Sequence, residues 1–182
     1  MALVEKRYIA QNARSRMVGV MELKEFYKCV KRWLDFEGYS EGKSGGKLFD
    51  EEYYKHAFKE GGFVNIDIKW MATKKANPYI TYKIELIWLL VAITKVEVIV
   101  DGKKLKKDKG DFEIRMTAWI EKDYTKLTKG TPWGFKWMQD LWERFIMKKE
   151  VEDHEEELRR KFMNLQKFIR DWMEQHIQSP MG

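Results

Sequence analysis

The fragment Gly42-Lys43-Ser44 has the residue types that end a phosphate-binding P-loop. That motif also requires a glycine five positions before Gly42, where this sequence has Glu37. A P-loop runs from a buried strand into a helix, whereas here a predicted helix ends at Gly38, just before the loop. The fragment therefore predicts no nucleotide site, and no cofactor is expected.

The three histidines, His56, His154 and His176, are too few and too far apart for a zinc site of short-spaced ligands. His154 lies among six carboxylates between positions 150 and 157. A di-iron bundle, however, needs a Glu three residues before each of two histidines, and Val151 occupies that place. We interpret His154 and His176 as residues of a charged helix, and we predict no metal site.

Nucleophilic and acid-base chemistry also lack a recognisable pattern. Cys29 falls on or beside the apolar stripe of a predicted helix, where a free cysteine usually packs as a small hydrophobe. The serines have no nucleophile-elbow context. Carboxylates in the central region alternate with lysines, as in cross-strand ion pairs. We therefore predict no catalytic residues, and an enzyme with an undetected pocket is only the third hypothesis.

Clustered lysines around a turn near position 102 give the clearest indication of function. Lysines on a projecting turn can neutralise phosphates, although they can also maintain solubility and protect a sheet edge. Arginines of the N-terminal segment would assist them. The predicted nucleic-acid contacts are Lys103, Lys104, Lys106, Lys107, Arg14 and Arg16.

These residues must be positioned by a fold that the hydrophobic periodicity outlines. Residues 22–37 have the spacing of a one-faced helix. A short helical segment is predicted at 51–59. Residues 64–72 and 80–88 then alternate with the period of two that half-buried strands show. The alternation fails across 89–92, which predicts a bulge or bend.

Beyond this break, Val96, Val98 and Val100 are predicted to face the core. The Asp-Gly pair at 101–102 predicts a tight hairpin turn, followed by a return strand at 103–106 and a last strand at 112–120. The predicted sheet residues facing a common core are Ile66, Ile68, Ile84, Leu86, Ile114 and Met116.

The last third of the chain is predicted to be helical, with Thr131 as cap and Pro132 in the first turn. Apolar residues between 151 and 176 keep a four-three spacing close to a heptad seam. This seam would pack on the sheet or on a second copy of the chain. Its principal residues are Leu158, Phe162, Leu165, Ile169 and Trp172.

Composition limits the class of protein. The 182 residues carry a net charge of +6 and suit one domain. The longest apolar run has eight residues, so no membrane insertion is expected, and the first thirty residues contain no stretch typical of a signal peptide. A single cysteine fits a reducing, cytoplasmic location. Few neutral polar residues beside many charged ones give a thermophile-like composition.

The sequence therefore predicts an α+β fold: an antiparallel meander of four to five strands with a leading helix and a long C-terminal helix. Residues 1–20 are predicted to be a basic N-terminal arm, 21–130 the helix and sheet, and 131–182 a helical region packed on or projecting from the same domain. The first functional hypothesis is a noncatalytic RNA- or ribosome-associated binding protein. The second is a protein-interaction module that forms a homo-oligomer through the seam.

Overall fold

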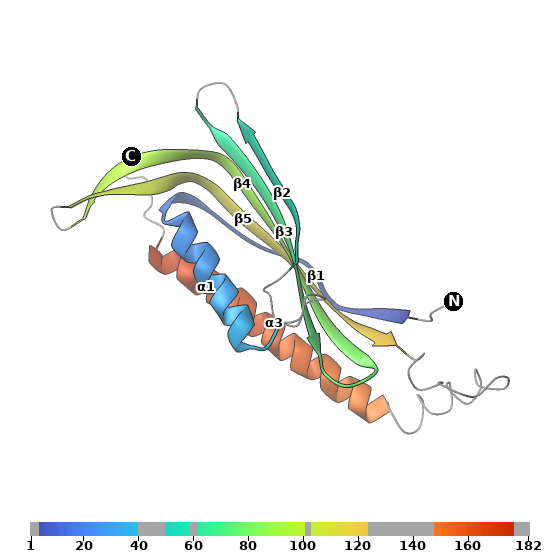
Figure 1. Ribbon diagram of the computed structural model, residues 1–182. Helices are drawn as coiled ribbons and strands as arrows, with labels where there is room; N and C mark the ends of the chain where they lie inside the picture. Colours follow the sequence, from blue (N-terminus) through green and yellow to red (C-terminus); the bar gives the residue numbers. More distant parts are fainter. Residues whose placement is uncertain (1–3, 40–49, 59–61, 101–102, 124–147, 177–182) are drawn as a thin grey trace.

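The computed structural model describes residues 4–39, 50–58, 62–100, 103–123 and 148–176. Within these ranges the chain forms strands and helices in one sequential order (Figure 1). The elements are β1 (Val4–Met21), α1 (Leu23–Phe36), β2 (Asp50–Phe58), β3 (Val64–Lys75), β4 (Ile80–Val100), β5 (Lys103–Asp123) and α3 (Lys148–His176).

The strands form one antiparallel sheet in the order β1-β5-β4-β3-β2. Strands β2 to β5 follow each other as a meander, and β1 closes the sheet by pairing with β5. The α+β class, the antiparallel meander, the leading helix and the long C-terminal helix are therefore confirmed.

Both helices cover the same face of the curved sheet (Figure 1). On that face Ile84, Leu86, Ile114 and Met116 are fully buried, because alternate residues of β4 and β5 point to the same side. Ile68 is also buried, and Ile66 is partly buried against the core. The prediction of a common sheet core is confirmed.

Aromatic rings fill the space between α1 and the sheet. Phe26 of α1 stacks on Trp172 of α3 with ring centroids 4.5 Å apart, and its edge meets Trp88 at 5.3 Å. Trp70 and Trp88 lie next to each other on β3 and β4, with centroids 4.9 Å apart. These rings are core residues rather than exposed platforms for bases.

The predicted N-terminal arm at 1–20 is wrong, because residues from Val4 onward form β1. From residue 13 the inward positions are small or apolar (Ala13, Ser15, Met17) and pack beside β5. Register shifts between Tyr8 and Ala13 interrupt the alternation, so the period of two is hidden in the sequence.

The short helix predicted at 51–59 is also wrong, because this segment is β2 and pairs with β3 from Asp50↔Met71 to Phe58↔Val64. Its polar-rich pattern is compatible with an edge strand as well as with a helix. The segment forms a strand because it can make backbone hydrogen bonds to the edge of β3. The return strand at 103–106 and the last strand at 112–120 are parts of one strand, β5.

The predicted bulge in β4 is confirmed. The register with β5 shifts between Val91 and Thr94, and Ala92 adopts a φ of 54°. The side-chain phase after the bulge differs from the prediction: Val96 pairs with Lys107 on the face away from the helices. Lys95, which pairs with Asp108, takes the helix-facing side instead.

Three predictions lie outside the described residues: the absence of a nucleotide site at Gly42-Lys43-Ser44, the hairpin turn at 101–102, and the helix start at Thr131 and Pro132. The described helices include none with the length and apolar character needed to cross a membrane.

Candidate nucleic-acid interface

The ends of β4 and β5 extend beyond the rest of the sheet (Figure 1). The last residue of β4 that pairs with β3 is Ile93, and the last residue of β5 that pairs with β1 is Asp108. Residues 96–100 and 103–107 pair only with each other in the described part of the chain. We call this two-stranded segment the lysine ribbon; its five residue pairs give a length of about 16 Å.

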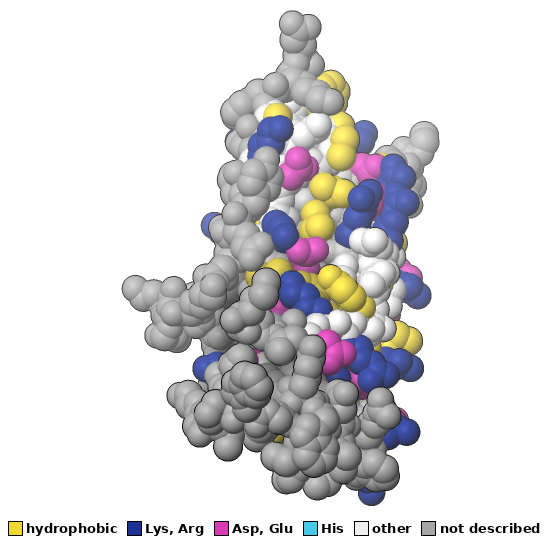
Figure 2. Space-filling model, turned by 90° about the vertical axis from the view of Figure 1, so that its right-hand side faces the viewer, with side chains coloured by type: hydrophobic (Ala, Val, Ile, Leu, Met, Phe, Trp, Pro, Cys, Tyr) yellow, Lys and Arg dark blue, Asp and Glu magenta, His cyan; other side chains and the backbone are white. Residues whose placement is uncertain are grey.

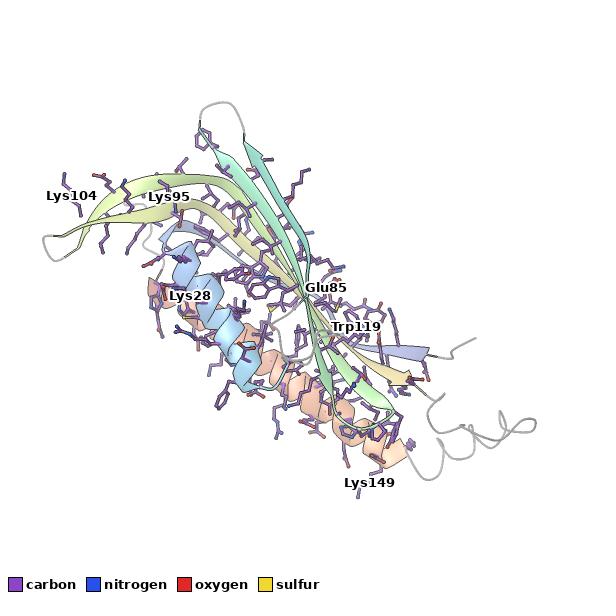
Figure 3. The ribbon with its side chains drawn as sticks, in the orientation of Figure 1. Lys28, Glu85, Lys95, Lys104, Trp119 and Lys149 are labelled. Carbon is purple, nitrogen blue, oxygen red and sulfur yellow. The ribbon has the colours of Figure 1, made fainter. Side chains whose placement is uncertain are left out.

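The register divides the predicted lysines between the two faces of the ribbon. Lys104 and Lys106 lie on the helix-facing side, and Lys107 occupies the opposite side. Lys104 and Lys106 are exposed, whereas Lys107 is partly exposed. In Figure 3, Lys104 lies far out on the ribbon and Lys95 lies at its base. The prediction that the lysines project from a rigid sheet fits this arrangement, but they do not form one flat patch.

Three lysines of the ribbon have no acidic partner among the described residues. Lys104, Lys106 and Lys107 make no ion pair there, although Glu97 stands opposite Lys106 in the register. At the base of the ribbon, Lys95 Nζ lies 2.5 Å from Asp108 Oδ1. Positive charge that is not locally neutralised is therefore concentrated beyond this pair.

Arg14 and Arg16 lie on the edge strand β1, where it pairs with β5, rather than on the ribbon. Arg14 Nη2 donates to Glu113 Oε2 at 2.7 Å, and Arg16 Nε donates to Asp111 Oδ1 at 2.9 Å. The hydrogen bond and charge of Asp111 raise the pKa of Arg16. Both guanidinium groups are half exposed but already have carboxylate partners.

The face of the sheet that points away from the helices carries further pairs of opposite charges. Lys69 pairs with Glu85 at 2.7 Å, and Lys83 pairs with Glu121 at 2.8 Å. Figure 2 shows basic and acidic side chains interspersed with hydrophobic ones on the face in view. Cross-strand ion pairs thus explain these carboxylates, as the sequence indicated.

Trp119 does not offer an open ring for stacking on a base. Its relative exposure is 6%, and its ring centroid lies 5.9 Å from that of Tyr8. The indole N–H donates to Glu121 Oε1 at 3.1 Å, and the Lys6 ammonium lies 5.7 Å from the ring.

The seam of α3 is buried within this chain. Its apolar side chains pack on the sheet and on α1, and Trp172 is partly buried beside them. Met173, which the sequence analysis did not assign to the seam, is also buried. The hypothesis of self-association required these apolar residues to be exposed, and they are buried in the core of the single chain. The buried seam residues are Leu158, Phe162, Leu165 and Ile169.

A polar contact between α3 and β4 was not predicted. The hydroxyl of Tyr82 hydrogen-bonds to His154 Nδ1 and donates to Glu157 Oε2 at 2.9 Å. Burial, followed by the hydrogen bond to Glu157, raises the pKa of Tyr82, so the hydroxyl stays protonated. Periodicity assigned Tyr82 to a strand and His154 to a helix, and nothing in that pattern indicates that they meet.

This contact joins α3 to β4 of the sheet. In the ranges that the structure describes, no group of three His, Cys, Asp or Glu side chains is arranged to hold a metal ion.

Comparison of the chain with protein-family models, with curated proteins and with solved structures gives no significant match.

Proposed function

We propose that the chain is a noncatalytic cytoplasmic protein that binds RNA or a ribonucleoprotein surface, such as that of a ribosome, through the lysine ribbon. The observation that carries this proposal is the contrast in charge pairing. Arg14, Lys69 and Lys83 on the sheet have carboxylate partners, whereas Lys104, Lys106 and Lys107 on the ribbon have none in the described part of the chain.

The shape of the ribbon supports the same proposal. A two-stranded ribbon can lie along the wide, shallow minor groove of an RNA helix, where the contacts are to phosphates and 2′-hydroxyl groups. Because its lysines lie on both faces, it can contact phosphates on either side. Lysine contacts of this kind position a partner without reading its sequence, and Trp119 is already packed. Low sequence specificity is therefore expected.

Arg14 and Arg16 take a smaller part in this proposal than the sequence suggested. A phosphate that approached either arginine would have to compete with Glu113 or Asp111, which already accept hydrogen bonds from them. The principal contacts are therefore Lys103, Lys104, Lys106 and Lys107.

The test is RNA affinity at two or more salt concentrations. The wild type is compared with a variant in which Lys103, Lys104, Lys106 and Lys107 are changed to Gln. For single-stranded RNA, each lost phosphate contact lowers the slope of log affinity against log salt by about 0.7, so four contacts give about 3. We expect the variant to bind more weakly at low salt and with a shallower slope.

A matched variant removes the same charge from α3. It changes four exposed cations to Gln, and we expect it to retain most of the affinity and slope. Equal binding by the ribbon variant and the α3 variant, or no binding by the wild type at low salt, would contradict the proposal. The α3 positions are Lys148, Lys149, Lys167 and Arg170.

A further inference from the structure

A cavity of about 640 Å³ opens between the start of α1 and the end of the sheet from which the ribbon projects. Its volume lies in the range of about 300–1,000 Å³ that small-molecule sites occupy. Strands β3 and β4 form one wall, and the first turns of α1 form the other. The aliphatic residues that line it are Leu23, Val64, Ile66, Ile68, Leu90 and Ile93.

The interior of this cavity is apolar. Ile68 and Ile93 are buried at 6% and 5% exposure, and Leu90 is fully buried. Tyr27 and Trp88 add aromatic surface. Six aliphatic side chains beside two aromatic ones suit a flexible alkyl chain, which can follow an irregular surface better than a flat ring system.

The rim of the cavity is basic. Lys24 and Lys28 come from the first turns of α1, and Lys95 comes from the base of the ribbon. Figure 3 shows Lys28 and Lys95 towards the same end of the molecule. Lys28 Nζ is 2.7 Å from Glu25 Oε1, and Lys95 pairs with Asp108.

Lys24 differs from the other two rim lysines. It is exposed and makes no ion pair among the described residues. It also lies in the first turn of α1, where the positive end of the helix dipole favours an anion. The side chain of the preceding residue, Glu22, makes no capping hydrogen bond to this turn. Lys24 therefore places a positive charge without an ion-pair partner in the described ranges at the mouth of an apolar cavity, and the nearest carboxylate charge that acts on it is that of its neighbour Glu25.

We propose that this cavity binds a single-chain fatty-acid-like carboxylate. The alkyl chain lies against the aliphatic walls, and the carboxylate stays at the rim beside Lys24. An apolar molecule without a charged head would leave Lys24 unused. A two-chain lipid is disfavoured because the cavity is the size of a site for one small ligand. The proposal does not depend on RNA binding, because Lys24 is not a residue of the ribbon.

The test is isothermal titration calorimetry of the full chain with octanoate, decanoate and dodecanoate, each below its micelle concentration. We expect one ligand per chain and an affinity that rises about fourfold per methylene, as burial of alkyl surface requires. Decanol serves as the comparison without charge, and we expect it to bind about tenfold more weakly than decanoate.

Two variants locate the ligand. Ile66→Trp fills the cavity and should abolish binding, while circular dichroism checks that the variant folds. Lys24→Glu should weaken decanoate about tenfold but leave decanol unchanged. Lys167→Glu on α3 makes the same charge change on an exposed residue of another element and should have no effect.

Three results would overturn the proposal. They are the absence of saturable binding by dodecanoate, unchanged binding by a folded Ile66→Trp variant, and equal effects of Lys24→Glu and Lys167→Glu. If Ile66→Trp does not fold, the comparison of the two charge variants decides alone.

Discussion

At the scale of single side chains, the cations of this protein fall into two groups. Several arginines and lysines on the sheet lie at hydrogen-bonding distance from a carboxylate, as Arg14 does from Glu113 and Lys83 from Glu121. Lys24, at the mouth of the cavity, and Lys104 and Lys106, on the ribbon, have no such partner in the part of the chain that the structure describes. Both proposed binding sites depend on this second group, because an anion can approach it without displacing a carboxylate.

The first group makes stability depend on pH. Burial raises the pKa of Glu113, but hydrogen bonds from Arg115 and Arg14 outweigh it, and the net effect lowers the pKa. A lowered pKa means that Glu113 stabilises the folded state above its unfolded pKa of about 4.3. This contribution is lost as the pH falls through the lower pKa of the folded state.

We therefore predict that Glu113→Gln lowers the free energy of unfolding at pH 7 by about 1 kcal/mol, because the partner arginines are half exposed and solvent screens them. The loss between pH 5 and pH 3 should be smaller than in the wild type. Urea unfolding across this range measures it. Glu152→Gln, in an exposed pair with Lys148, is the control and should match the wild type. An unchanged acid dependence in Glu113→Gln would contradict the assignment.

At the scale of elements, the bulge in β4 determines which way the ribbon presents its side chains. Gly110 of β5 lies opposite this bulge, between the residues that pair with Val91 and Thr94. A Cβ at Gly110 would overlap Ile93 Cδ1 and would lie 3.0 Å from the carbonyl oxygen of Val91. The close approach of the two strands therefore requires glycine at this position.

We predict that Gly110→Ala lowers the free energy of unfolding by about 1–3 kcal/mol, the usual cost of overpacking. The loss should be smaller in an Ile93→Val background, because valine has no Cδ1 atom to collide with the new methyl group. A double-mutant cycle measured by urea unfolding gives this coupling. Additive effects of the two substitutions would show that the contact is not the cause.

The elements with a regular period could be predicted from the sequence, and those without one could not. The first helix, strands β3 and β4 and the bulge follow from apolar spacing, because one face of each is buried. Strand β1 was missed because its register shifts between Tyr8 and Ala13 break the alternation. The lysine cluster was visible in the sequence, but its division between two faces depends on the register after the bulge.

The same limit explains why the cavity and the contact between β4 and α3 were not predicted. Leu23 and Ile93 both have apolar neighbours in the sequence, and periodicity assigns such residues to a core without saying whether the core is filled there. Tyr82 and His154 meet only because α3 crosses the sheet. Distances between elements are set by packing, which a one-dimensional pattern does not contain.

At the scale of the whole molecule, α3 is the element that closes the core. Its seam packs on the sheet and α1, and Arg7 of β1 binds Glu155 of α3 at 2.8 Å. The edge strand β1 is thus fixed to the helix by charge as well as by apolar contact. The residues that line the cavity and those of the ribbon include none from α3, so neither proposed site needs the seam to be free.

This arrangement gives a prediction about the seam itself. Leu165 is fully buried, and a charge placed there would lose its hydration without gaining a partner. We expect Leu165→Glu to lower the free energy of unfolding by more than about 3 kcal/mol or to unfold the chain. Met163→Glu, two residues earlier and 59% exposed, should change stability little.

Analytical ultracentrifugation measures the mass of the protein in solution and so distinguishes a seam that packs only within the chain from one that joins two chains. If the seam serves only the core, the wild type has the mass of one chain at high micromolar concentration, and Met163→Glu has the same mass. Leu165→Glu should then differ in stability rather than in assembly. An oligomeric wild type that Leu165→Glu converts into a folded single chain would instead support association through α3. In that case Leu165 would pack against a second chain in the oligomer. The same side chain cannot at the same time be buried against the sheet of its own chain, so the seam would have a role other than closing the core.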